Sequence, residues 1–390
     1  MENFDLDYFL RKCRDIFGDE PIALHRPVFE GREREYVTDC IDSNFVSSVG
    51  AKVTEFEELV ADFTGTKHAV ATVNGTAALH VALDLAGVNA GDEVITQALT
   101  FVATCNAISY TGAKPVFVDV DRDTMGLSPT ALRDFLERHA ESTAGGAINK
   151  RSGRRISACV PMHTFGFPCR AAQIAEICAE WGIVLVEDAA ESLGSYIGDK
   201  HTGTHGSMAT LSFNGNKVIT TGGGGMLITD DAELAMRAKH ITTTGKIPHP
   251  YEFVHDQLAY NYRMPNLNAA LGCAQMERLP EFLSVKCEVA AEWEKFFANV
   301  DVAFVTAVEG ARANHWLNTI VLNSKTEREK FIKYTNENSV MTRPIWTLMS
   351  KLKMFRDCQS DGLTNSVWLE ERVVNIPSSV PDGALRRLPV

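Results

Sequence analysis

The sequence predicts an α/β protein in which a large domain is built on a doubly wound, mostly parallel sheet and a smaller α+β domain follows it. Between about residues 55 and 240, segments rich in valine and isoleucine alternate with segments whose apolar residues recur at helical spacing. The predicted strands are apolar at almost every position, which is typical of parallel strands buried on both faces. Helices between such strands indicate a sheet that is covered on both sides.

The predicted elements follow one another in a regular order. Residues 1–20 are expected to form an amphipathic helical arm, and a helix at 56–63 precedes the first strand. Strands are expected at 68–73, 93–96, 114–121, 156–162, 183–190, 208–213 and 225–229. Helices between them are expected at 74–87, 101–112, 170–182 and 232–240, the last with Asp230 or Asp231 as its N-cap.

The alternation stops near residue 245. A polar stretch at 246–256 is followed by expected helices at 268–279 and 281–297, a strand at 316–323 and a helix at 326–338. We therefore expect an N-terminal arm at 1–20, the large α/β domain at 21–245 and the smaller α+β domain at 246–390.

The bulk composition limits the classes of function. The 390 residues carry 38 basic and 50 acidic side chains, and this net charge of -12 argues against binding to nucleic acid or to anionic lipid. The nine cysteines are odd in number and form no C-x-x-C pair, so we expect free thiols rather than a disulfide scaffold. The N-terminal segment lacks the apolar region of a signal peptide or membrane span. We therefore expect a cytoplasmic protein that does not interact with membranes.

Polar residues directly after the predicted strands are the first candidates for a site, because ligands of open α/β sheets bind beyond the carboxyl ends of the strands. Asn74, Gly75 and Thr76 follow the first strand at a helix N-terminus, where free N–H groups could hold a phosphate. Asp188 ends another strand and could pair with a protonated ring nitrogen. Taken singly, the tripeptide is more simply an N-capped turn, and Asp188 is equally a helix cap.

The segment SFNGNK carries the most reactive candidate. Ser212 ends a strand, and Lys217 follows five residues later in a turn that would present its amine to the same edge of the sheet. A primary amine forms a reversible Schiff base and can also carry a proton. A lone loop lysine is usually solvated, and the glycine run at 222–225 is by itself weak evidence.

The order of these pieces is more specific than any one of them. A phosphate turn, Phe101 at a helix start, Asp188, the Ser-x-x-x-x-Lys spacing and a glycine loop resemble the DegT/DnrJ/EryC1/StrS family of sugar aminotransferases, from about residue 24 to beyond Arg263. The resemblance implies the aspartate-aminotransferase-like fold (fold type I), pyridoxal 5'-phosphate as cofactor, and L-glutamate and a nucleotide-linked keto-sugar as substrates. The segments at 21–37 and 44–57 resemble the branch that acts at C4 of UDP-linked N-acetylated 4-keto-6-deoxy sugars, on routes to bacillosamine or legionaminic acid.

The same resemblance implies roles for individual residues. Lys217 would be the catalytic residue that holds the cofactor as a Schiff base, and Asp188 would keep the ring nitrogen protonated. Asn261 would reach the cofactor phosphate of a neighbouring subunit, which implies a homodimer with shared active sites. The full set of implied cofactor-binding residues is Gly75, Thr76, Phe101, Asp188, Glu191, Ser212, Lys217 and Asn261.

Substrate contacts and departures from the family pattern complete the expectation. The candidate substrate residues are Ser47, Ser48, His163, Arg263, Arg343 and Trp346, and each has a structural alternative; for His163 this is a satisfied buried histidine. Glu191 stands where many relatives have Gln or His, Gly223 where many have Glu, and Asn214 where His is common. The changes at Glu191 and Gly223 favour the N-acetyl-sugar branch.

Several alternatives stay open. The sugar could instead be GDP- or dTDP-linked and aminated at C3 or C4, or the chain could be a non-catalytic relative that binds cofactor or nucleotide-sugar. Related dehydratases carry histidine at the lysine position, so Lys217 argues against dehydration. His201 and His205 have metal-like spacing but no acidic or thiol partner close in sequence, so we expect no metal site. The basic run of Lys150, Arg151, Arg154 and Arg155 is most simply a solvated loop.

Overall fold

A large mixed sheet forms the centre of the computed structural model, which describes residues 4–19 and 21–387. Its main path runs in the order β1-β11-β10-β7-β6-β2-β3, and a hairpin of β4 and β5 extends it beside β6. Neighbouring pairs along β10-β7-β6-β2-β3 are parallel, whereas β11 is antiparallel to both β1 and β10. The strands are β1 His68–Thr72, β2 Glu93–Gln97, β3 Lys114–Val118, β4 Ala140–Thr143, β5 Gly146–Asn149, β6 Arg155–Val160, β7 Val184–Asp188, β10 Met208–Ser212 and β11 Gly225–Thr229.

Helices cover both faces of this sheet, as the apolar strands predict. Successive residues of β2 show why: Val94 packs into one buried cluster with α4, α5 and α8, and Ile95 packs into another with α6 and α7. The six helices around the sheet are α3 Ala51–Thr64, α4 Gly75–Leu85, α5 Val102–Tyr110, α6 Pro129–His139, α7 Ala171–Glu180 and α8 Ala232–Thr242. Asp231 is the N-cap of α8, whereas helix α6 was not predicted from the sequence. The doubly wound architecture is therefore confirmed.

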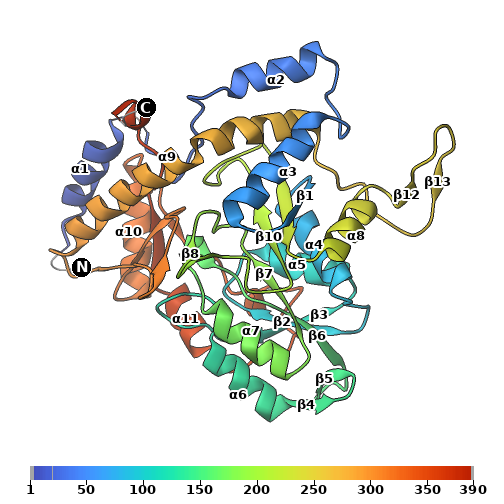
Figure 1. The fold of residues 1–390 in the computed structure, drawn as a ribbon. Helices are drawn as coiled ribbons and strands as arrows, with labels where there is room; N and C mark the ends of the chain where they lie inside the picture. Colours follow the sequence, from blue (N-terminus) through green and yellow to red (C-terminus); the bar gives the residue numbers. More distant parts are fainter. Residues whose placement is uncertain (1–3, 20, 388–390) are drawn as a thin grey trace.

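One long helix replaces the two expected at 268–279 and 281–297. Helix α9, Asn266–Phe297, is continuous across Pro280. Proline removes one intrahelical hydrogen bond. Leu279 and Phe282, on either side of Pro280, are buried in an extensive apolar cluster, and this burial offsets the loss. The prediction of two helices is thus wrong, and α9 instead runs from α3 to the C-terminal part of the chain (Figure 1).

A small antiparallel sheet of order β14-β16-β18-β17 organises the C-terminal part. The predicted strand at 316–323 and helix at 326–338 are confirmed as β16 and α10. This part comprises β14 Ala303–Phe304, β16 Asn318–Val321, α10 Lys325–Glu337, β17 Arg343–Pro344, η2 Met349–Lys351, α11 Thr364–Glu370, β18 Val373–Ile376 and η3 Ala384–Arg387. Helix α1, Leu6–Phe17, packs against it through Phe9, whose ring centroid lies 5.0 Å from that of Phe331.

The remaining elements lie at the periphery. Helix α2, Glu33–Asp42, packs along α9 and was not predicted. Three short strands, β8 Tyr196–Ile197, β9 Lys200–His201 and β15 Ala311–Arg312, form a third sheet, and η1 Thr164–Gly166 follows β6. The polar stretch after residue 245 forms the hairpin of β12 Lys246–Ile247 and β13 Val254–His255, which projects from the body of the protein (Figure 1). Within residues 4–19 and 21–387, every helix falls short of the length or the apolar character that a bilayer span requires.

Candidate active site

A cavity of about 310 Å³ opens at the carboxyl ends of the parallel strands, where the strand-end residues were expected to meet. The β1–α4 turn, the start of α5, the end of β7 and the β10–β11 loop contribute to it, together with Met162 after β6 and two tryptophans from the C-terminal part of the chain. Its lining includes Asn74, Gly75, Thr76, Phe101, Thr104, Met162, Asp188, Glu191, Ser212, Asn214, Asn216, Lys217, Trp316 and Trp346.

The turn from Asn74 to Thr76 places the N-terminus of α4 at the cavity. The Asn74 side chain caps the helix by accepting a hydrogen bond from the Ala77 N–H at 2.8 Å. Other N–H groups of this first turn have no partner within the helix, and the helix dipole favours an anion there. Together with the Ser212 hydroxyl across the cavity, the turn has the chemistry of a phosphate cradle.

Glycine residues allow the turn and the strands to approach closely. A Cβ atom on Gly75 would lie 3.1 Å from the Ser212 Cβ, closer than ordinary packing permits. A Cβ on Gly225 would lie 2.5 Å from the Gly75 nitrogen and would overlap the backbone of Asn74. The last residue of the glycine run therefore serves to seat the phosphate turn against β11, a purpose that its sequence alone does not reveal.

Asp188 supplies a buried carboxylate to the cavity. Its Oδ2 accepts a hydrogen bond from the Thr104 hydroxyl at 2.7 Å, and its Oδ1 accepts one from the Ala190 N–H at 3.2 Å. Burial raises the pKa of Asp188, whereas these two hydrogen bonds act in the opposite direction by stabilising the charged form. A carboxylate held in this way is suited to pair with a protonated ring nitrogen.

Lys217 extends into the same cavity from the β10–β11 loop. Its Nζ lies 3.2 Å from Oε1 of Glu191 and 3.7 Å from the ring centroid of Trp316. The Trp316 ring is itself fixed, because its indole N–H donates to the Asn216 carbonyl at 2.6 Å and its own carbonyl accepts from the buried Lys286 Nζ at 3.3 Å. Lys217 is therefore a held, largely shielded amine rather than a solvated loop lysine.

Aromatic rings form the other wall of the cavity. Phe101 is half exposed at the N-cap of α5, and its ring centroid lies 6.2 Å from that of Trp346. Trp346 packs in turn on Phe165, with 4.8 Å between the ring centroids. These flat apolar faces can pack against a planar cofactor ring or a sugar ring.

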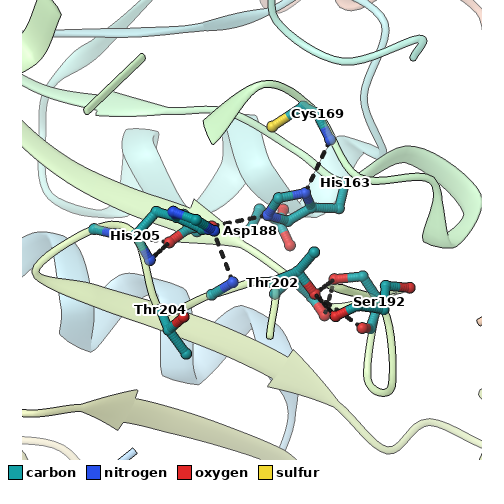
Figure 2. Close-up of polar contacts among 12 residues, drawn as sticks. His163, Cys169, Asp188, Ser192, Thr202, Thr204 and His205 are labelled. Atoms are coloured by element: carbon teal, nitrogen blue, oxygen red, sulfur yellow. Dashed lines mark hydrogen bonds and ion pairs between the residues drawn. The ribbon is translucent and has the colours of Figure 1, made fainter. Parts of the chain in front are cut away.

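His163 does not line the cavity, contrary to the prediction. Its Nε2 lies 2.9 Å from Oε2 of Glu187, and its Nδ1 accepts from the Cys169 N–H at 3.1 Å (Figure 2). The reason is strand parity: Met162 is paired with Asp188 and both line the cavity, so the adjacent residues His163 and Glu187 point the other way. His163 is thus a satisfied buried histidine.

Glu187 ties a neighbouring loop to the back of the site. Besides His163, its carboxylate accepts from the N–H groups of Gly203, His205 and Gly206 at 2.7 to 2.9 Å. His201 directs its Nε2 at the Gly194 N–H, 2.8 Å away. Within the described residues, no three His, Cys, Asp or Glu side chains converge as they would around a metal ion.

Besides His163, five predicted site residues lie outside the cavity. Ser47 and Ser48 precede α3; Asn261 is exposed, and the backbone of Arg263 pairs with Thr72 of β1. Arg343 is exposed on the edge strand β17, where its guanidinium donates to Asn336 at 2.9 Å. Contact of these residues with a site stays a prediction, which for Asn261 requires a partner subunit.

Several lining residues were not identified from the sequence, among them Thr104, Met162, Asn216 and Trp316. Trp316 begins a predicted strand, Met162 ends one, and Thr104 lies on a predicted helix one turn after its start. Asn216 lies within the segment SFNGNK but carries no distinctive chemical signal. Only the position of Met162 at a strand end could have suggested its role.

The sheet order together with a held lysine and a buried carboxylate in one cavity defines a pyridoxal-phosphate-dependent enzyme of the aspartate-aminotransferase fold. The chain belongs to the DegT/DnrJ/EryC1/StrS aminotransferase family, whose model matches residues 28–381. The predicted fold, family and cofactor are thereby confirmed.

Relatives match over most of their length. The chain is 35% identical to a GDP-perosamine synthase of Escherichia coli O157:H7, over 92% of this chain and 93% of the relative. It is also 35% identical to the putative pyridoxal phosphate-dependent aminotransferase EpsN of Bacillus subtilis, over 86% and 84% of the two chains. Among solved structures, DesI with its TDP-sugar product superposes with a TM-score of 0.82 at 28% identity, covering 95% of this chain and 91% of that chain.

The cavity fits the cofactor residue by residue. The α4 N-terminus and Ser212 would hold the phosphate, Asp188 would pair with the ring nitrogen, and Lys217 would bond the carbonyl carbon. The phenyl ring of Phe101 would cover one face of the cofactor's pyridine ring. The glycine-permitted approach of the turn to β10 and β11 is what brings the phosphate cradle within reach of the other groups.

Proposed function

We propose that this chain is an aminotransferase that moves the amino group of L-glutamate to the keto carbon of a nucleotide-linked sugar. The observation that carries the proposal is the placement of Lys217 and Asp188 in one cavity with the α4 N-terminus, in a member of an aminotransferase family. Bound pyridoxal phosphate supplies a carbonyl that exchanges between amines and a ring that withdraws electrons. The names of relatives, GDP-perosamine synthase among them, support a nucleotide-linked sugar as the acceptor.

The chain's own residues bind, orient and move protons in this reaction. Lys217 would hold the cofactor through Nζ and, when its Nζ is free, would carry a proton at that atom during the amino transfer. Ionised Asp188 would keep the ring nitrogen of the cofactor protonated. Trp316 and Trp346 exclude water from two sides of the reacting atoms.

We further propose a UDP-linked 2-acetamido-2,6-dideoxy-4-keto sugar as the acceptor, aminated at C4. The segments at 21–37 and 44–57 support this choice, and so do Glu191 and Gly223 at their positions. A GDP-linked 4-keto sugar is the second candidate, supported by three GDP-perosamine synthases at 32% to 35% identity. The amine would then serve the synthesis of a surface polysaccharide.

A second copy of the chain completes this proposal. Asn261 lies outside the cavity of its own chain, next to a projecting hairpin whose Tyr251 and Phe253 are each 81% exposed, with Leu258 fully exposed. Apolar side chains this exposed are typical of an interface. In a homodimer, Asn261 would reach the phosphate end of the neighbouring cavity.

The test uses purified protein, pyridoxal phosphate, L-glutamate and a panel of UDP-, GDP- and dTDP-linked 3- and 4-keto-6-deoxy sugars. Mass spectrometry is expected to detect replacement of the keto oxygen by an amine in one nucleotide series. Lys217→Ala is expected to abolish turnover and the visible absorbance of the bound cofactor, whereas Lys353→Ala, at an exposed lysine that does not line the cavity, serves as the matched control. Turnover by Lys217→Ala, or conversion of no sugar by wild type, would contradict the proposal.

A further inference from the structure

Glu191 has a place in the cavity that calls for an explanation beyond packing. Its side chain is 3% exposed, and each carboxylate oxygen has one donor: Oε2 accepts from the Phe165 N–H at 2.8 Å, and Oε1 faces the Lys217 Nζ at 3.2 Å. Trp316 covers the ammonium from another side at 3.7 Å. The Glu191 carboxylate is therefore in direct contact with the Lys217 amine, and both groups are shielded from water.

We propose that Glu191 is a catalytic residue that takes up the proton which the Lys217 ammonium must lose before its nitrogen can bond a carbonyl carbon. The proposal rests on the proposed function, in which Lys217 performs this step. An N–H bond at Nζ breaks and an O–H bond at Oε1 forms, so that an ammonium and a carboxylate become an amine and a carboxylic acid. The pair keeps the same atoms and the same net charge, and the amine gains the free lone pair that it needs.

The surroundings of Glu191 adapt it to this task. Burial raises the pKa of Glu191 to about 7, even though the Lys217 ammonium and the Phe165 N–H act in the opposite direction. The other charged group that faces it is Asp188 at the end of β7, which raises the pKa further; His25 faces Lys217 from the N-terminal segment. An exposed glutamate, with a pKa of about 4.3, would be a much weaker proton acceptor at neutral pH.

No other described lining residue can do the same work as well. Asp188 and Glu191 are the only carboxylates among the residues that line the cavity in the described chain. Asp188 already accepts from Thr104 and Ala190, and it is required in its ionised form at the ring nitrogen. Glutamine at residue 191 could contact Lys217 but could not hold its proton.

The test measures how readily Lys217 of the full-length, cofactor-stripped protein captures a carbonyl as pH is varied. Formaldehyde and cyanoborohydride methylate the neutral amine, and peptide mass spectrometry compares Lys217 with the exposed Lys353 in the same sample between pH 5.5 and 9.5. In wild type we expect Lys217 labelling to rise about tenfold per pH unit below about pH 7 and then to level off. Above that pH the pair shares a single proton, so the fraction of neutral Lys217 is set by how that proton divides between Glu191 and Lys217 and no longer by pH. Labelling of Lys353 should continue to rise.

The variants separate proton transfer from packing. Glu191→Gln is expected to remove the break near pH 7, so that Lys217 labelling rises continuously through it, whereas Glu191→Asp retains a break. Glu93→Gln, which makes the same change at another buried glutamate outside the cavity, is expected to keep the wild-type profile.

A wild-type profile without a break between pH 6 and 8, or the same break in Glu191→Gln, would overturn the proposal. The wild-type measurement tests the proposal even if the variants fail to fold. Formaldehyde replaces both sugar and glutamate in this measurement. A failure of the proposed amino transfer would therefore leave the labelling profile intact, and the two failures can be told apart.

Discussion

Removing the Thr104 hydroxyl should raise the pKa of Asp188 and shift the pH dependence of the enzyme. Thr104 is fully buried on α5 and donates to Asp188 Oδ2 at 2.7 Å, while its oxygen lies 2.8 Å from the Thr100 hydroxyl. Valine has nearly the same shape, so Thr104→Val deletes the hydrogen bond to the carboxylate and leaves the packing in place. It also deletes the contact with the Thr100 hydroxyl, which keeps the Met162 sulfur as a partner at 3.1 Å.

The magnitude follows from the energy of that bond. A hydrogen bond to a charged group contributes about 1.5–3 kcal/mol, and one pKa unit corresponds to about 1.4 kcal/mol. Burial already raises the pKa of Asp188, and the Thr104 hydroxyl opposes this effect, so its loss should raise the pKa by about one to two further units. The cofactor-free variant should also lose about 1.5–3 kcal/mol of stability at pH values where Asp188 is ionised. This difference should disappear as the pH falls and the carboxyl becomes protonated in both proteins.

Two measurements check this reasoning. The acid limb of kcat/KM against pH should move upward by about one to two units in Thr104→Val, and urea unfolding of the cofactor-free protein should show the stability difference at pH 7.5 but not at acid pH. Thr104→Ser keeps the hydroxyl and is the matched control. If the acid limb of the valine variant coincides with that of the serine variant, Thr104 does not tune Asp188.

Three further predictions concern the support of the cavity. Gly225→Ala adds a methyl group 2.5 Å from the Gly75 nitrogen and should weaken cofactor binding at least tenfold by displacing the phosphate turn, as measured by fluorescence titration; unchanged affinity would contradict the packing argument. Burial lowers the pKa of Lys286 to about 7, below its unfolded value of about 10.4, so the unfolded chain binds one more proton than the folded protein between these pH values. In urea unfolding, the stability of wild type relative to Lys286→Met should therefore rise by up to about 1.4 kcal/mol per pH unit from pH 7 to 10. A fall in relative stability over this range would contradict the buried, neutral lysine. Trp316→Leu removes the ring beneath Lys217 and should lower kcat more than it raises KM for L-glutamate, whereas an effect on KM alone would point to substrate binding.

The seven strands along the main path of the large sheet were predictable because burial on both faces leaves a local record, whereas the β4–β5 hairpin was not predicted. Each residue of a parallel strand between helix layers must be apolar whichever way it points, so the pattern requires no knowledge of partners. The N-terminus of α4 was predictable for a similar reason, since Asn74 caps the helix through an atom three residues away. Helix α9 was not, because the tolerance of Pro280 depends on distant partners of Leu279 and Phe282.

The residues of the site likewise fall into those with a local signal in the sequence and those that reach the cavity through distant contacts. Asp188 and Ser212 end strands that the sequence marks, and Lys217 follows one of them closely, so all three were candidates by position. The family resemblance then implied their roles. Trp316 reaches the cavity from the C-terminal part of the chain, 99 residues after Lys217, and the glycine at 225 matters because of Asn74, far earlier in sequence. Neither contact has a local signature.

Strand parity explains why His163 was misplaced while Asp188 was identified. At a strand end, two consecutive residues point to opposite faces, and the sequence at 162–163 offers an apolar methionine and a reactive histidine. Chemistry favours the histidine, but the pairing of Met162 with Asp188 assigns the cavity face to the methionine. A shift of one residue in that register would exchange His163 with Met162, so the composition of the site depends on register between strands as much as on the residues that each strand carries.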